Sequence, residues 1–336
     1  MTQLDITHNT LDLPLSAGPG IDRQLGPALR EALFEDDTTL FAVLDGSRIP
    51  GLTEKLVAQD LQHTCLFSGE MAQDAAETAP WLVEMHADAP LLRQMLCDVP
   101  DDWAGVHGFM RRGAGVLIRT RADMGALRRH LRRFLRVTDA TDRAYFFRFW
   151  EPDAAAVYFR TIAARTDLAL RWMCPRDADP IDALLLPTWL EGPGLVTIRP
   201  GPLPDPVPEV RGPFTLAAAE VEALRDLQWR RDKWQLEERL RRTFPDVANR
   251  LGSDLAPRVS AVVDRMVGLG FWRRDMLFTF CAWAAHYGAD VLDRDPQGHI
   301  PAALAQDGSA EDRFALISAR MDVLERDYFA KPGMLS

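Results

Sequence analysis

The stretch AYFFRFWEP, residues 144–152, places one arginine in the middle of an aromatic run and closes the run with an acidic residue and a proline. Successive side chains of an extended strand point to opposite faces, so Arg148 shares one face with Phe146 and Trp150. Aromatic residues also occupy the other face. Apolar side chains on both faces are typical of a central strand that is buried on both sides, and we expect such a strand here.

A guanidinium buried in such a strand needs a carboxylate partner, because breaking a buried ion pair costs about 3–5 kcal/mol. The candidates are Asp45, at the end of the apolar run LFAVLDG (residues 40–46), and Glu151. If the two strands are neighbours, Asp45 and Arg148 meet at the edge of the sheet. We favour an ion pair that fixes the order of the strands over the alternative, an arginine that binds a ligand or a substrate.

Short apolar runs alternate with helical patterns through the first half of the chain. Helices are expected over residues 50–60, 91–96 and 124–137. The runs expected to form strands are residues 40–46, 63–69, 80–85, 103–110, 113–120 and 144–150. This alternation predicts an α/β lobe with a mostly parallel or mixed sheet flanked by helices.

Prolines mark the expected domain boundary. The segment GPLPDPVPEVRGP has prolines at nearly alternate positions, which neither a helix nor a central strand tolerates. The predicted organisation is an N-terminal extension with a short helix, an α/β lobe, a proline-rich linker and an all-helical C-terminal lobe. Their ranges are residues 1–38, 39–199, 200–213 and 214–336.

The long helix expected after the linker carries two apolar stripes, one of which includes Trp229, Leu236 and Leu240. A helix that is apolar on two sides packs between neighbours or offers one side to a partner. These three residues are therefore candidates either for the internal core or for a partner-binding surface.

Composition favours a folded protein without extended basic surfaces. The chain has 336 residues, 47% of them apolar, and a formal net charge of −10, which argues against a general nucleic-acid binder. Its four cysteines are spread without a CxxC pair and are expected to be free thiols of a reducing compartment. The N-terminus does not resemble a secretory signal and no apolar stretch approaches a membrane span, so we expect a soluble, cytoplasmic protein.

Catalytic signatures are sparse in this sequence. There is no GxxxxGK[ST], no GxGxxG after a strand, no HExxH and no GxSxG. His63 and Cys65 fall on one side of an expected strand, but no third ligand follows at a useful spacing, and two half-buried strand residues are the better interpretation. No catalytic, metal-binding or cofactor-binding residue is predicted.

The helix expected over residues 124–137 carries five arginines opposite its apolar face, among them Arg129 and Arg133. Nucleic-acid binding is one interpretation. However, the arginines lack interleaved aromatic residues for base stacking, and a solvated face or one matched to an acidic partner is favoured. Arg129 and Arg133 are therefore candidate partner-binding residues.

Four motifs follow one another over about residues 39–165: Asp45-Gly46, Pro80-Trp81-Leu82, Leu127–Leu135 and Arg148-Phe149-Trp150-Glu151-Pro152. Their order and spacing resemble the effector adaptors, also called effector chaperones, of type VI secretion systems. The sequence differs from the family pattern at Ser47, where alanine is usual, at Trp81 and Trp150, where tyrosine is usual, and at Glu151, where aspartate is usual.

The resemblance implies a non-catalytic adaptor that holds a toxic effector in the cytoplasm and loads it onto the valine–glycine-repeat spike protein, VgrG. Asp45, Arg148 and Glu151 would then be structural, and the effector and VgrG would be the partners, without nucleic acid or membrane. The alternative is an enzyme, a hydrolase or transferase, that uses Asp45, His63 and Arg148 in a cleft at the strand ends.

Overall fold

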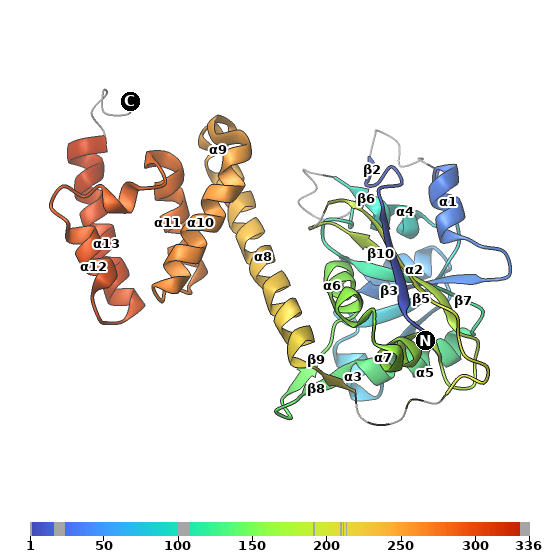
Figure 1. Ribbon diagram of the computed structural model, residues 1–336. Coiled ribbons are helices and arrows are strands. Elements are labelled where there is room, and N and C mark those ends of the chain that lie inside the picture. The colour runs from blue at the N-terminus through green and yellow to red at the C-terminus, as the bar shows by residue number, and fades with distance from the viewer. Residues whose placement is uncertain are drawn as a thin grey trace. The chain divides into compact units, whose positions relative to one another are not determined.

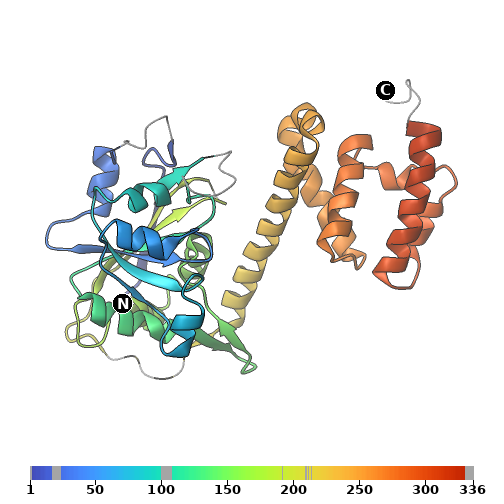
Figure 2. The same ribbon diagram turned by 180° about the vertical axis from the view of Figure 1, so that it is seen from behind.

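The computed structural model describes residues 2–16, 24–99, 108–190, 192–208, 210, 212 and 214–329 (Figures 1 and 2). Contacts divide the chain into two compact units, Met1–Leu227 and Gln228–Ser336. The first unit combines sheets and helices, and the described part of the second is helical. The proline-rich residues 200–213, predicted as the boundary, fall within the first unit, and the division lies inside helix α8 (Ala218–Thr243).

The main sheet of the first unit has seven strands in the order β1-β11-β10-β7-β3-β5-β4. The strands are β1 Leu4–Asn9, β3 Thr39–Asp45, β4 His63–Cys65, β5 Pro80–Met85, β7 Gly115–Thr120, β10 Ile181–Thr188 and β11 Gly194–Pro200. The strands predicted at 40–46, 80–85 and 113–120 are confirmed, and residues 63–69 contribute the shorter β4. The run 103–110 lies largely outside the described residues, and its described end is a turn. Residues 1–38 are more than an extension, because β1 pairs with β11.

The prediction of a parallel or mixed main sheet is wrong, because every pair of neighbouring strands in it is antiparallel. Strands β3 and β4 do run in the same direction and are joined through helix α2 (Leu52–Ala58), but β5 lies between them. In the same way, β3 lies between β5 and β7. The alternation of helices and strands in the sequence correctly predicted connections that pass through a helix to a strand of the same direction. It did not predict that another strand lies between the two strands that each connection joins.

Helices cover both faces of the main sheet. On one face, Phe41 and Val43 pack with residues of α5 (Met124–Leu131), α6 (Pro152–Ile162) and α7 (Thr166–Met173). On the other, Leu40 and Leu44 pack with residues of α1 (Pro27–Leu33), α2 and α4 (Pro90–Leu96). Helix α3 (Glu70–Asp74) follows β4. Two short strands, β2 Leu15–Ser16 and β6 Cys97–Asp98, pair with each other in parallel, outside the main sheet.

The aromatic run at 144–150 is not a central strand of the main sheet. Only its first residues form a strand, β9 (Ala144–Phe146), which lies at the edge of a three-stranded sheet with β8 (Arg136–Asp139) and β12 (Thr215–Leu216). Phe147 and Phe149 leave the strand and pack in an aromatic cluster against Trp172. The run is apolar on both faces because of this cluster, which lies outside any ladder of strands.

The predicted helices of the C-terminal half are confirmed, although β12 precedes them and pairs with β8. After α8 come α9 Pro245–Leu251, α10 Leu255–Gly268, α11 Arg274–Tyr287, α12 His299–Ala305 and α13 Ala310–Leu324. One apolar core joins them, with Val263, Phe280 and Ile317 fully buried. Within these helices the buried apolar residues follow the period of 3.6 residues, as Val259, Val263 and Met266 do in α10.

Candidate functional site

Asp45 ends strand β3 in a tight turn. Its backbone N–H donates to the Ala114 carbonyl at 2.8 Å, and its carbonyl accepts from Arg48 N at 3.0 Å. Gly46 N donates to the Ala79 carbonyl at 3.0 Å, and a Cβ at Gly46 would lie 2.5 Å from the Glu77 carbonyl oxygen. The Asp-Gly pair is therefore required by the close approach of two backbone segments.

The Asp45 carboxylate, which is 2% exposed, joins three other side chains. Its Oδ1 accepts hydrogen bonds from Ser47 N at 3.0 Å and Ser47 Oγ at 2.5 Å. Its Oδ2 accepts from the Trp150 indole N–H at 3.1 Å and from Arg148 Nη2. We call these four residues the Asp45 network. These donors satisfy the hydrogen-bonding capacity of a carboxylate that the fold removes from water.

Arg148 forms the predicted ion pair with Asp45 and also donates to Ser47 Oγ at 3.2 Å. Its side chain is 38% exposed, so it closes the Asp45 network at the surface and is not buried within a strand. Sequence reasoning missed Ser47 and the indole of Trp150 as partners. Ser47 was detectable, since serine two residues after an aspartate often donates to that carboxylate in a turn.

Glu151 and Pro152 begin helix α6 directly beside the Asp45 network. Pro152 occupies the first turn of the helix, where its missing N–H is not needed. Glu151 Oε1 forms an ion pair with Arg48 Nη2 at 3.0 Å, and Arg48 Nη1 donates to the Arg112 carbonyl at 2.8 Å. The carboxylate of Glu151 thus links the start of α6 to the turn after β3.

Pro80 and Trp81 open strand β5 alongside this turn, with Pro80 opposite Asp45 and Trp81 opposite Leu44. The Trp81 indole N–H donates to the Ala76 carbonyl at 3.0 Å, and its ring meets His63 edge-on with centroids 5.5 Å apart. These contacts hold the segment before β5 against the sheet, which is a structural role.

His63 lies away from Asp45 and Arg148. It pairs with Val83 on β5, which in turn pairs with Ala42 on β3. His63 is therefore about 10 Å from Asp45 along the strand direction and about 10 Å across the sheet, and its Nδ1 contacts the Leu61 carbonyl at 2.7 Å. The structure does not bring together the three residues of the enzyme hypothesis.

The arginines of α5 and the following turn are not simply a solvated face. Arg128 Nε donates to the Cys65 carbonyl at 2.7 Å and its Nη2 donates to the Phe67 carbonyl at 2.9 Å. Arg129 is exposed, whereas Arg133 is half-buried. Arg128 is therefore structural, and the two candidate partner-binding arginines occupy different surroundings.

Among the candidate residues of α8, Leu236 is 5% exposed and Leu240 is 1% exposed in the core of the second unit. Of the two roles considered for these leucines, the internal core is correct and the partner-binding surface is not, because their side chains are already covered by the chain itself. Trp229 is half-buried. Its indole N–H donates to Asp264 Oδ1 at 3.3 Å, and its ring lies 6.3 Å from that of Trp272, which is 67% exposed.

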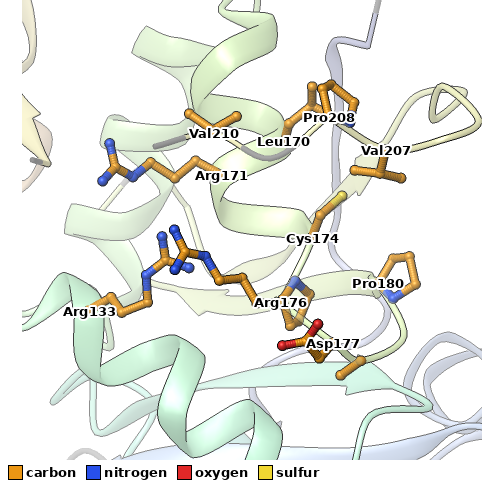
Figure 3. Close-up of a pocket in the computed structure, with 12 residues that line it drawn as sticks. Arg133, Leu170, Arg171, Cys174, Arg176, Asp177, Pro180, Val207, Pro208 and Val210 are labelled. Carbon is orange, nitrogen blue, oxygen red and sulfur yellow. The ribbon is translucent and has the colours of Figure 1, made fainter. Parts of the chain in front are cut away.

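A basic pocket of about 570 Å³ lies in the first unit, and the side chains of Arg133, Arg171 and Arg176 are arranged around it (Figure 3). Arg171 stacks over the Phe214 ring at 5.4 Å and donates to the Gly212 carbonyl. Cys174 also lines the pocket, and burial raises the pKa of its thiol. The sequence did not indicate this pocket, because Arg133 is separated by about forty residues from the other two arginines.

Three features of the described part of the chain bear on metal binding, membrane insertion and cysteine chemistry. Across these residues, no three histidine, cysteine, aspartate or glutamate side chains gather closely enough to hold a metal ion. None of the described helices combines the length and the apolar character needed to cross a membrane. The cysteines are free, and burial raises the pKa of Cys281 to about 12.

Residues 40–167 match the model of a protein family described as Domain of unknown function (DUF4123). The matched range contains the whole Asp45 network, Glu151 and Pro152. It ends before the basic pocket residues Arg171 and Arg176. No curated protein and no solved structure matches the chain.

Proposed function

We propose that the chain is a non-catalytic effector adaptor of a type VI secretion system. It binds a toxic effector in the cytoplasm and loads it onto the VgrG spike protein. The match over residues 40–167 covers the motifs that resemble this class of adaptors, and the family description itself assigns no function.

The observation that carries the proposal is that the charged motif residues form hydrogen bonds and ion pairs with one another and with neighbouring segments of the chain. Asp45 and Arg148 are two of the three residues that the enzyme hypothesis would present to a substrate, and Glu151 belongs to the same motif as Arg148. Instead, Asp45 is bonded to Arg148, Trp150 and Ser47, and Glu151 is bonded to Arg48. These contacts support a rigid scaffold for binding another polypeptide.

Capture of partners from the source bacterium tests the proposal. The tagged full-length chain is expected to co-purify with one VgrG protein and one toxin in near-stoichiometric amounts, as quantified by mass spectrometry. Deletion of its gene is expected to abolish secretion of that toxin while other effectors are still secreted. Capture of neither protein, with normal toxin secretion in the deletion strain, would contradict the proposal.

The arginine face gives a second test of the same proposal. Reversing charge at Arg129 and Arg133 together is expected to weaken effector capture if this face contacts the effector, because electrostatic complementarity speeds association. Single variants separate the two positions: Arg133 lines the basic pocket and Arg129 does not. If the double variant captures the effector as well as the parent chain does, the surface that carries Arg129 and Arg133 does not contribute to effector binding.

A further inference from the structure

Two large apolar side chains of the first unit that remain exposed line the same shallow groove. Met71 of α3 is 46% exposed and Phe146 of β9 is 48% exposed. The ring of Phe67 meets that of Phe146 edge-on with centroids 5.6 Å apart and forms part of the groove wall. The full lining is Leu66, Phe67, Ser68, Met71, Arg132, Arg133, Leu135, Arg136 and Phe146.

The rim of this groove is cationic. Arg132, Arg133 and Arg136 line it, and none of the described residues that line it is acidic. Arg136 pairs with Phe146 across β8 and β9, and residues directly opposite in an antiparallel pair share one face. The Nε of Arg132 is buried without a hydrogen-bond partner among the described residues. An apolar floor with donors at its edge suits a ligand that carries both apolar groups and carboxylates.

Size and charge narrow the class of ligand. The groove has a volume of about 280 Å³, at the lower end of the range of about 300–1,000 Å³ typical of small-molecule sites, and it is open enough to admit a side chain of another protein. Arg133 also lines the basic pocket, so the cationic surface continues beyond the groove. In a chain of net charge −10, this local cluster of arginines is complementary to an acidic partner.

We propose that this groove binds an acidic segment of a partner protein. An apolar side chain of that segment would lie between Met71 and Phe146, and its carboxylates would face Arg132, Arg133 and Arg136. The identification of the partner as the effector depends on the proposed function, but the chemistry of the groove does not.

Site-specific photo-crosslinking in the source bacterium tests the groove. The full-length chain carries p-benzoyl-phenylalanine at position 71 or, as a matched control, at Val57, which is 71% exposed on α2 of the same unit. Position 71 is expected to crosslink to one segment rich in aspartate and glutamate with apolar residues among them. Crosslinks no stronger than those at position 57, or a crosslinked segment that is not acidic, would overturn the proposal.

Charge and apolar contacts are then removed separately. Arg136→Glu and Phe146→Ser are each expected to reduce the position 71 crosslink about tenfold, the first by placing a like charge against the acidic segment and the second by removing apolar contact. Arg30→Glu, which is exposed on α1 and lies outside the groove, is expected to leave the crosslink unchanged. Both groove residues are exposed, so thermal unfolding is expected to match the parent chain. Undiminished crosslinking in both groove variants would contradict the proposal.

The outcomes separate the two proposals. If the chain captures the toxin and VgrG but shows no groove-dependent crosslink, the proposal for the groove is wrong and the proposed adaptor function is supported. If the groove crosslinks to an acidic segment of a protein that is neither a toxin nor VgrG, the proposal for the groove is supported and the proposed adaptor function is contradicted. Binding of labelled DNA that falls steeply with salt and is lost in Arg136→Glu would replace the acidic segment with nucleic acid.

Discussion

The two compact units are stabilised by different kinds of polar contact. In the first unit, single side chains join segments far apart in sequence, as Asp45 does with Trp150 and as Arg128 does with the Cys65 carbonyl. In the second, ion pairs between helices, such as Lys233 with Asp264 and Arg274 with Asp232, leave one partner more than half exposed, and others are local, such as Arg241 with Glu237 one helical turn away. Buried and half-buried polar side chains thus join distant segments in the first unit, whereas these ion pairs of the second unit lie at its surface.

Asp295 of the second unit forms an ion pair that is well covered on both sides. Its carboxylate accepts hydrogen bonds from Gln297 N at 3.1 Å, Ile300 N at 3.0 Å and Arg320 Nη2 at 2.6 Å. Both side chains of the ion pair are well covered, with Asp295 0% and Arg320 13% exposed. This contact fixes the start of α12 to α13 and resembles the Asp45 network more than its own surroundings.

Asp295→Ala is expected to cause the largest loss in this comparison. Removing one partner of a buried ion pair costs about 3–5 kcal/mol, and Arg320 would remain covered. Chemical denaturation followed by circular dichroism measures the change. If the units unfold separately, the substitution shifts the transition of the second unit alone. An equal shift in the first unit would contradict the independence of the two units.

Asp45→Ala is expected to destabilise the first unit by about 2–3 kcal/mol, mostly through the loss of an acceptor for buried donors. The loss is smaller than at Asp295 because Arg148 is 38% exposed and remains partly hydrated. Urea denaturation measures the difference. The control is Asp167→Asn, which disrupts the exposed Arg165–Asp167 pair and should change stability by less than about 0.5 kcal/mol. Equal effects at the two aspartates would disprove the structural role of the Asp45 network.

Gly46→Ala tests the backbone part of the same turn. The added methyl group would lie within 2.5 Å of the Glu77 carbonyl and 2.9 Å of the Ala79 carbonyl. Overpacking of this kind costs about 1–3 kcal/mol. Thermal unfolding measures the loss, with Gly26→Ala as a control because a Cβ there meets nothing within 4 Å. A neutral Gly46→Ala would show that the two backbone segments can separate without cost.

Acid is expected to affect the first unit before the second. Burial lowers the pKa of His130 from 6.5 to about 4, so the unfolded state binds a proton first and stability falls as the pH drops from about 6.5 towards 4. The slope is about 1.4 kcal/mol per pH unit. Hydrogen bonds from Arg320 lower the pKa of Asp295 from 3.8 to about 2, so the stability contributed by that group is lost only as the pH falls below about 3.8.

Comparison of the parent chain with His130→Gln isolates this histidine. Stability of the first unit is measured by urea denaturation at intervals between pH 7 and 4. The difference between the two proteins is expected to change with pH, whereas the second unit shows no such difference. Parallel pH profiles for both proteins would mean that the pKa of His130 is the same in the folded and unfolded states, which would contradict the effect of burial.

The sequence predicted what depends on local pattern and on strong pairwise chemistry. Strands β3 and β5 followed from apolar runs bounded by turns, and the partnership of Asp45 with Arg148 followed from the cost of a lone buried charge. The order of the strands did not follow, because insertion of β5 between β3 and β4 depends on long-range packing. For the same reason the groove was missed, since Met71, Arg136 and Phe146 come from three segments and meet only in the folded chain.

The two hydrogen bonds that Arg128 donates to the Cys65 and Phe67 carbonyls affect how the edge of the main sheet can pair with other molecules. Strand β4 is the last of the main sheet, and exposed sheet edges invite pairing with strands of other molecules. A guanidinium occupies two carbonyls at and just beyond this short strand, so an incoming chain would have to displace a charged donor to extend the sheet. We therefore expect the Arg128 side chain to oppose pairing of β4 with a strand of another molecule.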